Sequence, residues 1–183
     1  MTRTLTPTQA SRVYDRLAPI MNLSAVVEDK ATNELLAHLD LARTESVFEF
    51  GCGTGHFARQ LMRQAPLARY QGLDVSPRMV ALARKALKPW QERAALWVSE
   101  GGAPTAQPDA SCDRFVSNYV LDLLPEAMIV QVLDEAHRML RPGGLLALSS
   151  LTEGHTPASR ALIRGWSWLH GRQPALVAGC RPI

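Results

Sequence analysis

The sequence contains little cysteine, and its cysteines form no cluster. Cys52, Cys112 and Cys180 are far apart in a chain of 183 residues, and no Cys-x-x-Cys pair occurs. Structural zinc sites and disulfide frameworks need clustered or paired cysteines, so neither is predicted and no metal site is expected. Isolated thiols suit a reducing compartment, which predicts a cytoplasmic protein.

Long apolar runs and blocks of like charge are absent as well. No stretch approaches the roughly 20 apolar residues that span a bilayer, and the first residues do not resemble a secretory signal peptide. The 20 Lys and Arg residues are scattered and nearly balanced by 17 Asp and Glu, for a formal net charge of +3. Binding of nucleic acid through charge alone is therefore not expected, and neither is a membrane span.

What the sequence does contain is an alternation of β-favouring and helical segments. Hydrophobic residues make up 46% of the chain, which is enough for a buried core in a single domain, 1–183. Helical crossovers between successive strands force parallel pairing, which predicts an α/β fold with a doubly wound, mostly parallel sheet. The predicted strands are 46–50, 68–75, 95–99, 113–120 and 145–151.

Helices are predicted on both sides of this core. Before the first strand, Thr6 and Pro7 begin one helix, and Ser24 fits the N-cap of a second. After the last strand, a helix is expected from Thr156 to His170. The chain thus divides into a helical lead-in (1–45), a core (46–151) and a C-terminal helix with a short tail (152–183).

The stretch EFGCGTGH, residues 49–56, places Gly51, Gly53 and Gly55 between an apolar strand and a helix. Alternate glycines let a ligand rest on the main chain, and the helix start offers free N–H groups. A tight turn without a ligand is the alternative. Glu49 stands just before the glycines, where a carboxylate repels a pyrophosphate and attracts a cation. The pattern favours a positively charged ligand, such as one carrying a sulfonium and an ammonium group.

The dinucleotide fingerprint G-x-G-x-x-G fits this stretch less well. Its third glycine would fall at residue 56, which is a histidine. Asp74, at the end of the second predicted strand, has the two acceptor oxygens that ribose hydroxyls need. An NAD site would use such an acid too, so Asp74 does not separate the two interpretations. An NAD-type oxidoreductase stays as the less favoured alternative.

Four segments, in order along the chain, resemble the motifs of class I S-adenosylmethionine-dependent methyltransferases. They are VFEFGCGTGHFA, YQGLDVSPRMVALAR, CDRFVSNYVLDLLP and EAHRMLRPGGLLALSSL, and they cover roughly residues 46–151. Near the start, YDRLAPIMNL resembles the lead-in helix of the quinone-type and other small-molecule branches. The resemblance implies a Rossmann-like methyltransferase fold, S-adenosylmethionine as cofactor, and a small-molecule methyl acceptor.

The resemblance also implies a set of cofactor contacts. Asp74 would bind both ribose hydroxyls, and Tyr14 would cover the cofactor from the lead-in helix, with packing as its alternative role. Asn118, at the end of the fourth predicted strand, would lie beside the methyl group. The remaining residues of the matching motifs that would bind the cofactor are Glu49, Gly51, Cys52, Gly53, Gly55 and Val75.

Three residues are candidates for the methyl-transfer step. The resemblance places Asn118 and Tyr119 at the junction of cofactor and acceptor, with packing as the alternative role of the tyrosine. His155 follows the fifth predicted strand, as does Glu153. Each is either a base toward a phenol or enol or part of a solvated surface loop.

Two departures from the family pattern bear on activity. The family usually has an Asp after the third strand that contacts the adenine amino group. Here Gly101 and Gly102 occupy those positions, and Glu100 either reaches the adenine or is solvated. The family also continues with an antiparallel strand pair, whereas the final segment PALVAGCRPI has room for one short strand. We therefore expect a C-terminally shortened form whose uncovered sheet edge pairs in a homodimer.

The predicted function is S-adenosylmethionine-dependent methyl transfer to a small molecule. Neither the acceptor nor the type of atom methylated can be derived from the sequence. The alternative is a non-catalytic or truncated cofactor-binding or assembly protein with the same fold. The missing adenine-contacting acid and the short C-terminal segment keep that alternative open.

Overall fold

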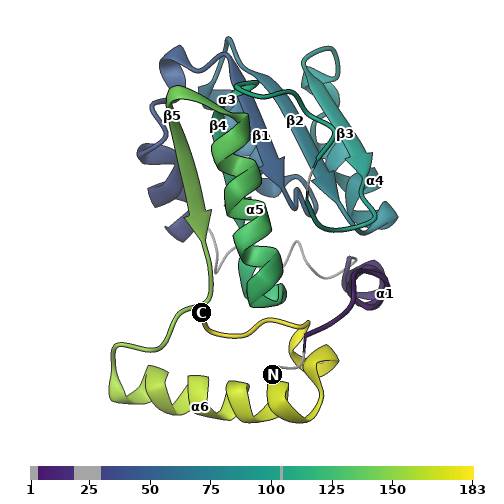
Figure 1. The fold of residues 1–183 in the computed structure, drawn as a ribbon, viewed down its shortest axis with the longest axis vertical. Helices are drawn as coiled ribbons and strands as arrows, with labels where there is room; N and C mark the ends of the chain where they lie inside the picture. Colours follow the sequence, from purple (N-terminus) through teal and green to yellow (C-terminus); the bar gives the residue numbers. More distant parts are fainter. Residues whose placement is uncertain (1–3, 19–29, 104) are drawn as a thin grey trace.

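Five parallel strands form the central sheet of the computed structural model, which describes residues 4–18, 30–103 and 105–183 (Figure 1). The strand order is β3-β2-β1-β4-β5, and every neighbouring pair is parallel. The doubly wound α/β fold is therefore confirmed. The strands are β1 (Ser46–Phe50), β2 (Arg69–Asp74), β3 (Ala94–Val98), β4 (Cys112–Asn118) and β5 (Leu140–Ser149).

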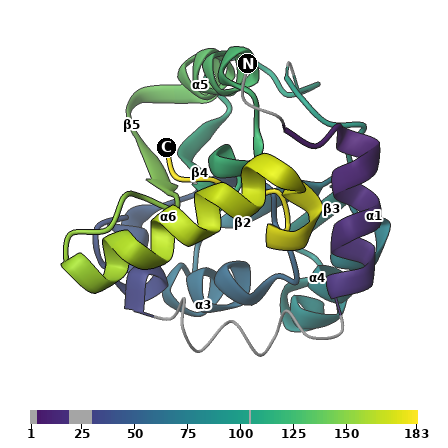
Figure 2. The same ribbon diagram turned by 90° about the horizontal axis from the view of Figure 1, so that it is seen from below.

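Helices cover both faces of the sheet, with α5 on one face and α3 and α4 on the other (Figure 2). Residues 30–37 are helical, and the N-cap predicted at Ser24 lies outside the described residues. Within the described ranges, no helix has both the length and the apolar character needed to cross a bilayer. The helices are α1 (Pro7–Leu17), α3 (His56–Gln64), α4 (Pro77–Ala86), α5 (Glu126–Met139) and α6 (Pro157–Arg172), with short 3-10 helices η1 (Leu41–Arg43), η2 (Lys88–Trp90), η3 (Leu121–Leu123) and η4 (Pro174–Val177).

Side-chain caps begin three of these helices, and those of α1 and α6 lie at the positions predicted from the sequence. At α1, Thr6 Oγ1 accepts the Gln9 N–H at 3.3 Å, and Gln9 Oε1 accepts the Thr6 N–H at 3.0 Å. Ser76 Oγ accepts the Met79 N–H at 3.1 Å at the start of α4, and Thr156 caps α6 in the same way. Each cap satisfies an N–H that has no partner inside the helix, which contributes about 1 kcal/mol.

Alternation of side chains along β1 divides the core into two layers. Phe48 packs on Phe115, with ring centroids 5.2 Å apart, in the cluster that contains Val132 of α5. Val47 belongs to the cluster on the opposite face, with Leu61 of α3. Burying one such side chain stabilises the fold by about 1.5–3 kcal/mol. A shift of one residue would move each side chain of β1 into the opposite layer, where it does not fit its neighbours, so the alternation fixes the register of β1.

The structure differs from the sequence prediction at β5 and in the tail. β5 begins at Leu140, so the Arg-Pro-Gly-Gly stretch lies inside the strand rather than ahead of it. Its register with β4 shifts between Cys112 and Arg114, and Gly143 has φ +79°. An edge strand tolerates such a bulge because one of its sides makes no ladder hydrogen bonds. The tail forms η4 in place of the one short strand for which the sequence had room.

The carboxyl ends of the strands form the edge at which a ligand crevice is expected. From β1 the chain winds to β2 and β3 on one side, and it then returns to β4 and β5 on the other. The switch point therefore lies between β1 and β4, where sheets of this type bind ligands. The strand arrowheads point toward α6 in Figure 1, and in Figure 2 α6 and the chain end cross in front of the sheet.

Candidate functional site

The glycine-rich loop between β1 and α3 turns sharply at the switch point. Gly53 has φ +50° and Gly55 has φ +77°, a region that side chains rarely adopt. A Cβ on Gly55 would lie 2.8 Å from the Cα of Ala83 in α4, so that glycine permits close packing. A Cβ on Gly53 would meet no described atom within 4 Å. The main chain at Gly53 is thus open to a ligand.

Hydrogen bonds join this loop to the end of β2. The N–H groups of Gly51 and Cys52 donate to the carbonyl oxygen of Leu73 at 2.9 and 2.8 Å. The Gly53 N–H donates to Asp74 Oδ2 at 3.0 Å. The loop and the strand-end acid, which the sequence indicated separately, therefore form one unit.

Asp74 accepts two backbone hydrogen bonds and retains acceptor positions for a ligand. Besides the Gly53 N–H on Oδ2, the N–H of Ser76 donates to Oδ1 at 2.9 Å. Burial raises the pKa of Asp74, and the N–H groups of Ser76, Gly53 and Val75 oppose that rise. A carboxylate offers about four acceptor positions. The two hydrogen bonds and the nearby Val75 N–H therefore leave acceptor capacity on this carboxylate for ribose hydroxyls.

Glu49 lies inside the sheet, with its side chain shielded from solvent. The residue is 1% exposed, and the Tyr70 hydroxyl donates to its Oε2. Gly72 makes this contact possible, because a Cβ there would lie 2.5 Å from the Tyr70 hydroxyl oxygen. Burial raises the pKa of Glu49 to about 8, despite the hydrogen bond from Tyr70, which lowers it. Glu49 is thus mostly protonated at neutral pH, and its attraction for a cationic ligand requires loss of that proton.

Cys52 is a buried, neutral thiol within the loop. Burial raises its pKa, and Glu49 and Asp74 add to that effect. A thiol of raised pKa is a weak nucleophile and a weak metal ligand. Among the described residues, no three His, Cys, Asp or Glu side chains gather as a metal site.

The loop after β3 carries Glu100, Gly101 and Gly102. A Cβ on Gly101, which has φ +93°, would lie 2.7 Å from the Cβ of Pro7, so this glycine lets α1 approach the loop closely. Glu100 is exposed. Its contact with adenine stays a prediction.

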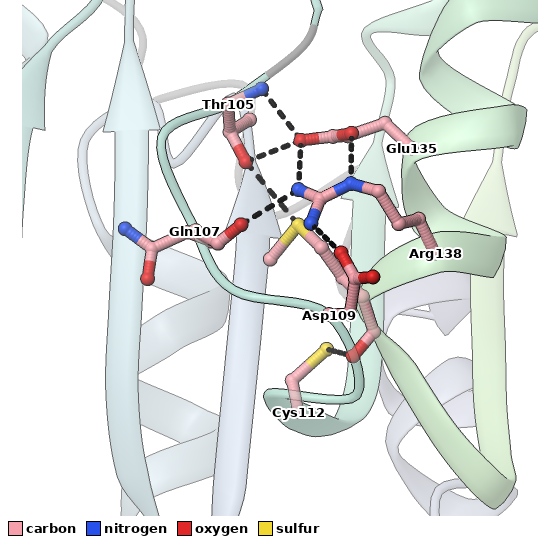
Figure 3. A network of polar contacts seen from close by, with 7 residues as sticks. Thr105, Gln107, Asp109, Cys112, Glu135 and Arg138 are labelled. Carbon is pink, nitrogen blue, oxygen red and sulfur yellow. Dashed lines mark hydrogen bonds and ion pairs between the residues drawn. The ribbon is translucent and has the colours of Figure 1, made fainter.

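A polar network anchors the rest of this loop to α5 (Figure 3). Glu135 Oε1 accepts the Thr105 N–H at 2.5 Å, the Thr105 hydroxyl at 2.6 Å, and a bond from Arg138 at 2.8 Å. Arg138 also pairs with Asp109 and donates to the Gln107 carbonyl oxygen at 2.7 Å. The hydrogen bond from Arg138 contributes most to lowering the pKa of Glu135 to about 2. This network was not predicted from the sequence, since its members are isolated polar residues.

The three catalytic candidates and Glu153 occupy two different places. Asn118 ends β4, and its Oδ1 accepts a hydrogen bond from the hydroxyl of Ser149 at the end of β5. Tyr119 has φ +55°, and its N–H donates to the Ser149 carbonyl oxygen at 2.8 Å. His155 and Glu153 are exposed in the segment between β5 and α6, which leads away from the sheet in Figure 1. The roles of all four residues in methyl transfer stay predictions.

The chain end packs across the carboxyl edge of the sheet. The Tyr14 hydroxyl of α1 donates to the Ala178 carbonyl oxygen at 3.3 Å and lies 3.9 Å from Cys180 Sγ. The Arg181 N–H donates to the carbonyl oxygen of Asp122 at 3.1 Å. Tyr14 and Ala178 are 164 positions apart in sequence, so no local motif indicates this contact. Among the described residues, one surface hollow runs along α3 from His56 to Gln64, and another lies at the amino ends of β1, β2 and β3.

A doubly wound sheet with an open glycine loop joined to a strand-end acid defines a protein that binds an adenosyl or dinucleotide cofactor. The family model of the methyltransferase domain matches residues 47–144 of this chain. The chain belongs to that family, and with it to the class I S-adenosylmethionine-dependent methyltransferases. The open Gly53 main chain and the free acceptor positions of Asp74 fit the family's cofactor.

Curated relatives match most of the chain. Trans-aconitate 2-methyltransferase of Azoarcus sp. (strain BH72) is 34% identical over 154 residues, which are 84% of this chain and 56% of the relative. Malonyl-[acyl-carrier protein] O-methyltransferase of Pectobacterium atrosepticum is 33% identical over 186 residues, which are 95% of this chain and 64% of the relative. The chain thus spans less than two thirds of the length of either relative.

Solved structures share the fold at low identity. The [4+2]-cyclase SpnF has a TM-score of 0.73 at 20% identity, covering 84% of this chain and 63% of the cyclase. The N-methyltransferase NodS of Bradyrhizobium japonicum WM9, solved with S-adenosylhomocysteine, has a TM-score of 0.66 at 24% identity, covering 86% and 77%. At such identities the likeness shows the fold alone. A cyclase among these structures illustrates that one fold supports more than one chemistry.

Proposed function

We propose that this chain binds S-adenosylmethionine at the glycine loop and Asp74 and transfers the methyl group to a small-molecule acceptor. The observation that carries the proposal is the open main chain at Gly53, held by its N–H bond to Asp74 at the switch point. The bound cofactor supplies a methyl group already activated by its sulfonium. The protein's task is therefore alignment of the reactants and exclusion of water.

Each site residue contributes to alignment or water exclusion from a different position. Asp74 accepts the two ribose hydroxyls in a geometry already set by Gly53 and Ser76. Glu49, once deprotonated, balances the positive charge of the cofactor from behind the loop. Glu100 and the glycines after it border the adenine. Tyr14 and the chain end exclude water from the carboxyl edge.

Calorimetric titration tests the cofactor assignment. We expect saturable binding of S-adenosylhomocysteine and S-adenosylmethionine, and no binding of NAD. Binding of NAD alone would contradict the proposal and restore the oxidoreductase alternative. NAD is not expected to bind because His56 stands where the dinucleotide fingerprint has its third glycine.

A panel of acceptors with labelled methyl donor tests catalysis. The two curated relatives are named for trans-aconitate and for malonyl-[acyl-carrier protein], so small organic acids and thioesters belong in the panel beside phenols, alcohols and amines. Transfer to any member supports the proposal. Cofactor binding without transfer to any of them would favour the non-catalytic alternative.

We also propose a homodimer that forms through β5. In the described sheet, β5 pairs with β4 on one side only, and Leu145 and Leu146 are 40% and 42% exposed. Unpaired strand edges tend to pair with another chain. Light scattering should show a dimer that Leu146→Lys dissociates, and a wild-type monomer would contradict the proposal. A cytoplasmic location is proposed with it, and cell fractionation checks that location.

A further inference from the structure

Asp122 is a buried acid to which the proposed site assigns no role. It lies in η3, just beyond the end of β4, and is 1% exposed. Its Oδ1 has no hydrogen-bond partner among the described residues. A buried carboxyl oxygen without a partner weakens the fold. An unused acceptor at the ligand-binding edge of the sheet therefore points to a partner that arrives with a ligand.

Polar side chains connect Asp122 to the cofactor half of the crevice. The Cys180 thiol interacts with the Asp122 carboxyl group, and Cys180 Sγ lies 3.9 Å from the Tyr14 hydroxyl. Burial raises the pKa of Tyr14, and Cys180, Asp122 and Asp74 all add to the rise. Tyr14 is therefore close enough to both acids to sense their charge.

The positions of the two acids on the sheet differ. Asp74 ends β2 beside the glycine loop, in the half proposed for the cofactor. Asp122 follows β4, and the chain end that packs against it continues to the end of β5, where the Ile183 N–H donates to the Leu151 carbonyl oxygen at 3.1 Å. Ligands of doubly wound sheets lie across the switch point. The ends of β4 and β5 are thus the side left for the acceptor.

We propose that Asp122 faces the methyl-transfer position from the acceptor side and takes a proton from a hydroxyl or amine acceptor. This inference rests on the proposed function and adds the acceptor class, because the Asp122 carboxylate would repel a carboxylate acceptor. The acceptor oxygen or nitrogen forms its bond to the methyl carbon. The carbon–sulfur bond breaks with its electron pair remaining on sulfur, and the acceptor's proton passes to the Asp122 carboxylate.

The electrostatic surroundings suit this role at neutral pH. Burial raises the pKa of Asp122 to about 6, while its own backbone N–H, the Leu151 N–H, the Cys180 thiol and the Arg181 charge oppose the rise. A general base is most effective when its pKa lies near the working pH. Asp122 is thus ionised at neutral pH and yet more basic than an ordinary aspartate.

The test compares two cofactor analogues and needs no knowledge of the acceptor. Sinefungin carries an ammonium group where S-adenosylmethionine carries its methyl group, whereas S-adenosylhomocysteine carries nothing there. Calorimetry at neutral pH compares both ligands on the wild type, Asp122→Asn and the control Asp134→Asn, whose carboxylate is exposed on α5. We expect Asp122→Asn to weaken the binding of sinefungin at least about tenfold, since a charge-assisted hydrogen bond is lost. S-adenosylhomocysteine should keep its affinity, and the control should change neither ligand.

An equal change for both ligands, or no change for either, overturns the inference. Failure of the wild type to bind S-adenosylhomocysteine would instead contradict the proposed function.

If Asp122→Asn does not fold, the pH dependence of ligand binding by the wild type provides the test. The wild type's preference for sinefungin should fall as the pH drops below about 6. Glu49, with a pKa of about 8, changes its charge above this range, and Asp74 is proposed to bind the ribose that both ligands share. Burial raises the pKa of the neighbouring Tyr14 phenol, and it lowers the pKa of His170, a buried imidazole close enough to Arg181 to sense its charge. A preference independent of pH would overturn the inference.

Discussion

The region proposed for the cofactor is built from neighbouring segments, whereas the region proposed for the acceptor is built from distant ones. The glycine loop and Asp74 come from β1 and β2, which are adjacent strands, and backbone hydrogen bonds join them. Tyr14, Asp122 and Cys180 come from α1, η3 and the chain end, and they meet only because the tail packs across the sheet edge. Short motifs therefore predict the first region, while the second depends on tertiary packing.

Removal of the Asp74 carboxylate should cause the largest loss of cofactor affinity. Asp74→Ala deletes the acceptor of two ribose hydroxyls and the partner of the Gly53 and Ser76 N–H groups. A hydrogen bond to a charged group contributes about 1.5–3 kcal/mol, so the Kd for S-adenosylhomocysteine should rise at least about tenfold. Calorimetry measures this, with Asp134→Ala as the matched surface control. Unchanged affinity would remove Asp74 from the site.

Two glycines of the loop should respond differently to the same change. Gly55→Ala brings a Cβ to 2.8 Å from the Ala83 backbone, and such overpacking costs about 1–3 kcal/mol of unfolding free energy. Gly53→Ala meets no described atom within 4 Å, so only backbone strain of about 1–2 kcal/mol is added. Relative to the unfolding free energy that each variant loses, Gly53→Ala should weaken S-adenosylhomocysteine binding more than Gly55→Ala does. Urea unfolding and calorimetry compare the pair, and a Gly55→Ala protein of wild-type stability would refute the packing argument.

Two buried glutamates should give the unfolding free energy opposite dependences on pH. Glu49 has a folded pKa of about 8 against an ordinary 4.5, so stability falls as the pH rises from about 4.5 to 8, where only the unfolded chain ionises. Glu135 has a folded pKa of about 2, so its contribution is lost as the pH falls from about 4.5 to 2. Urea unfolding across this range should show that Glu49→Gln reduces the change in unfolding free energy between pH about 4.5 and 8. Glu135→Gln should reduce the change between pH about 2 and 4.5. If neither change is reduced, these groups are not buried as described.

Tyr14→Phe should have the smallest effect. It removes the hydroxyl that contacts the Ala178 carbonyl oxygen and Cys180, for a loss of about 0.5–1.5 kcal/mol in unfolding free energy. Urea denaturation measures this loss. S-adenosylhomocysteine affinity, measured in parallel, should change far less than in Asp74→Ala. A loss as large as that of Asp74→Ala would show that Tyr14 binds the cofactor directly and does more than hold the tail.

The sequence predicts β1 and the start of α1 well because their signals are local. β1 is an apolar run that ends at a glycine, and α1 begins with a Thr-Pro pair whose threonine caps the helix. Tyr70 was not predicted as the partner of Glu49, since the contact depends on the register between β1 and β2 and on the space left by Gly72. The environment of Asp122 was not predictable because residues from the far end of the chain create it.

The central claim is that the glycine loop and Asp74 together hold S-adenosylmethionine. A crystal structure grown with S-adenosylhomocysteine tests it most directly. We predict both ribose hydroxyls within hydrogen-bond distance of the Asp74 carboxylate, and the amino-acid tail over the main chain at Gly53. A ligand whose ribose lies away from Asp74, or whose tail lies outside the glycine loop, would contradict the claim.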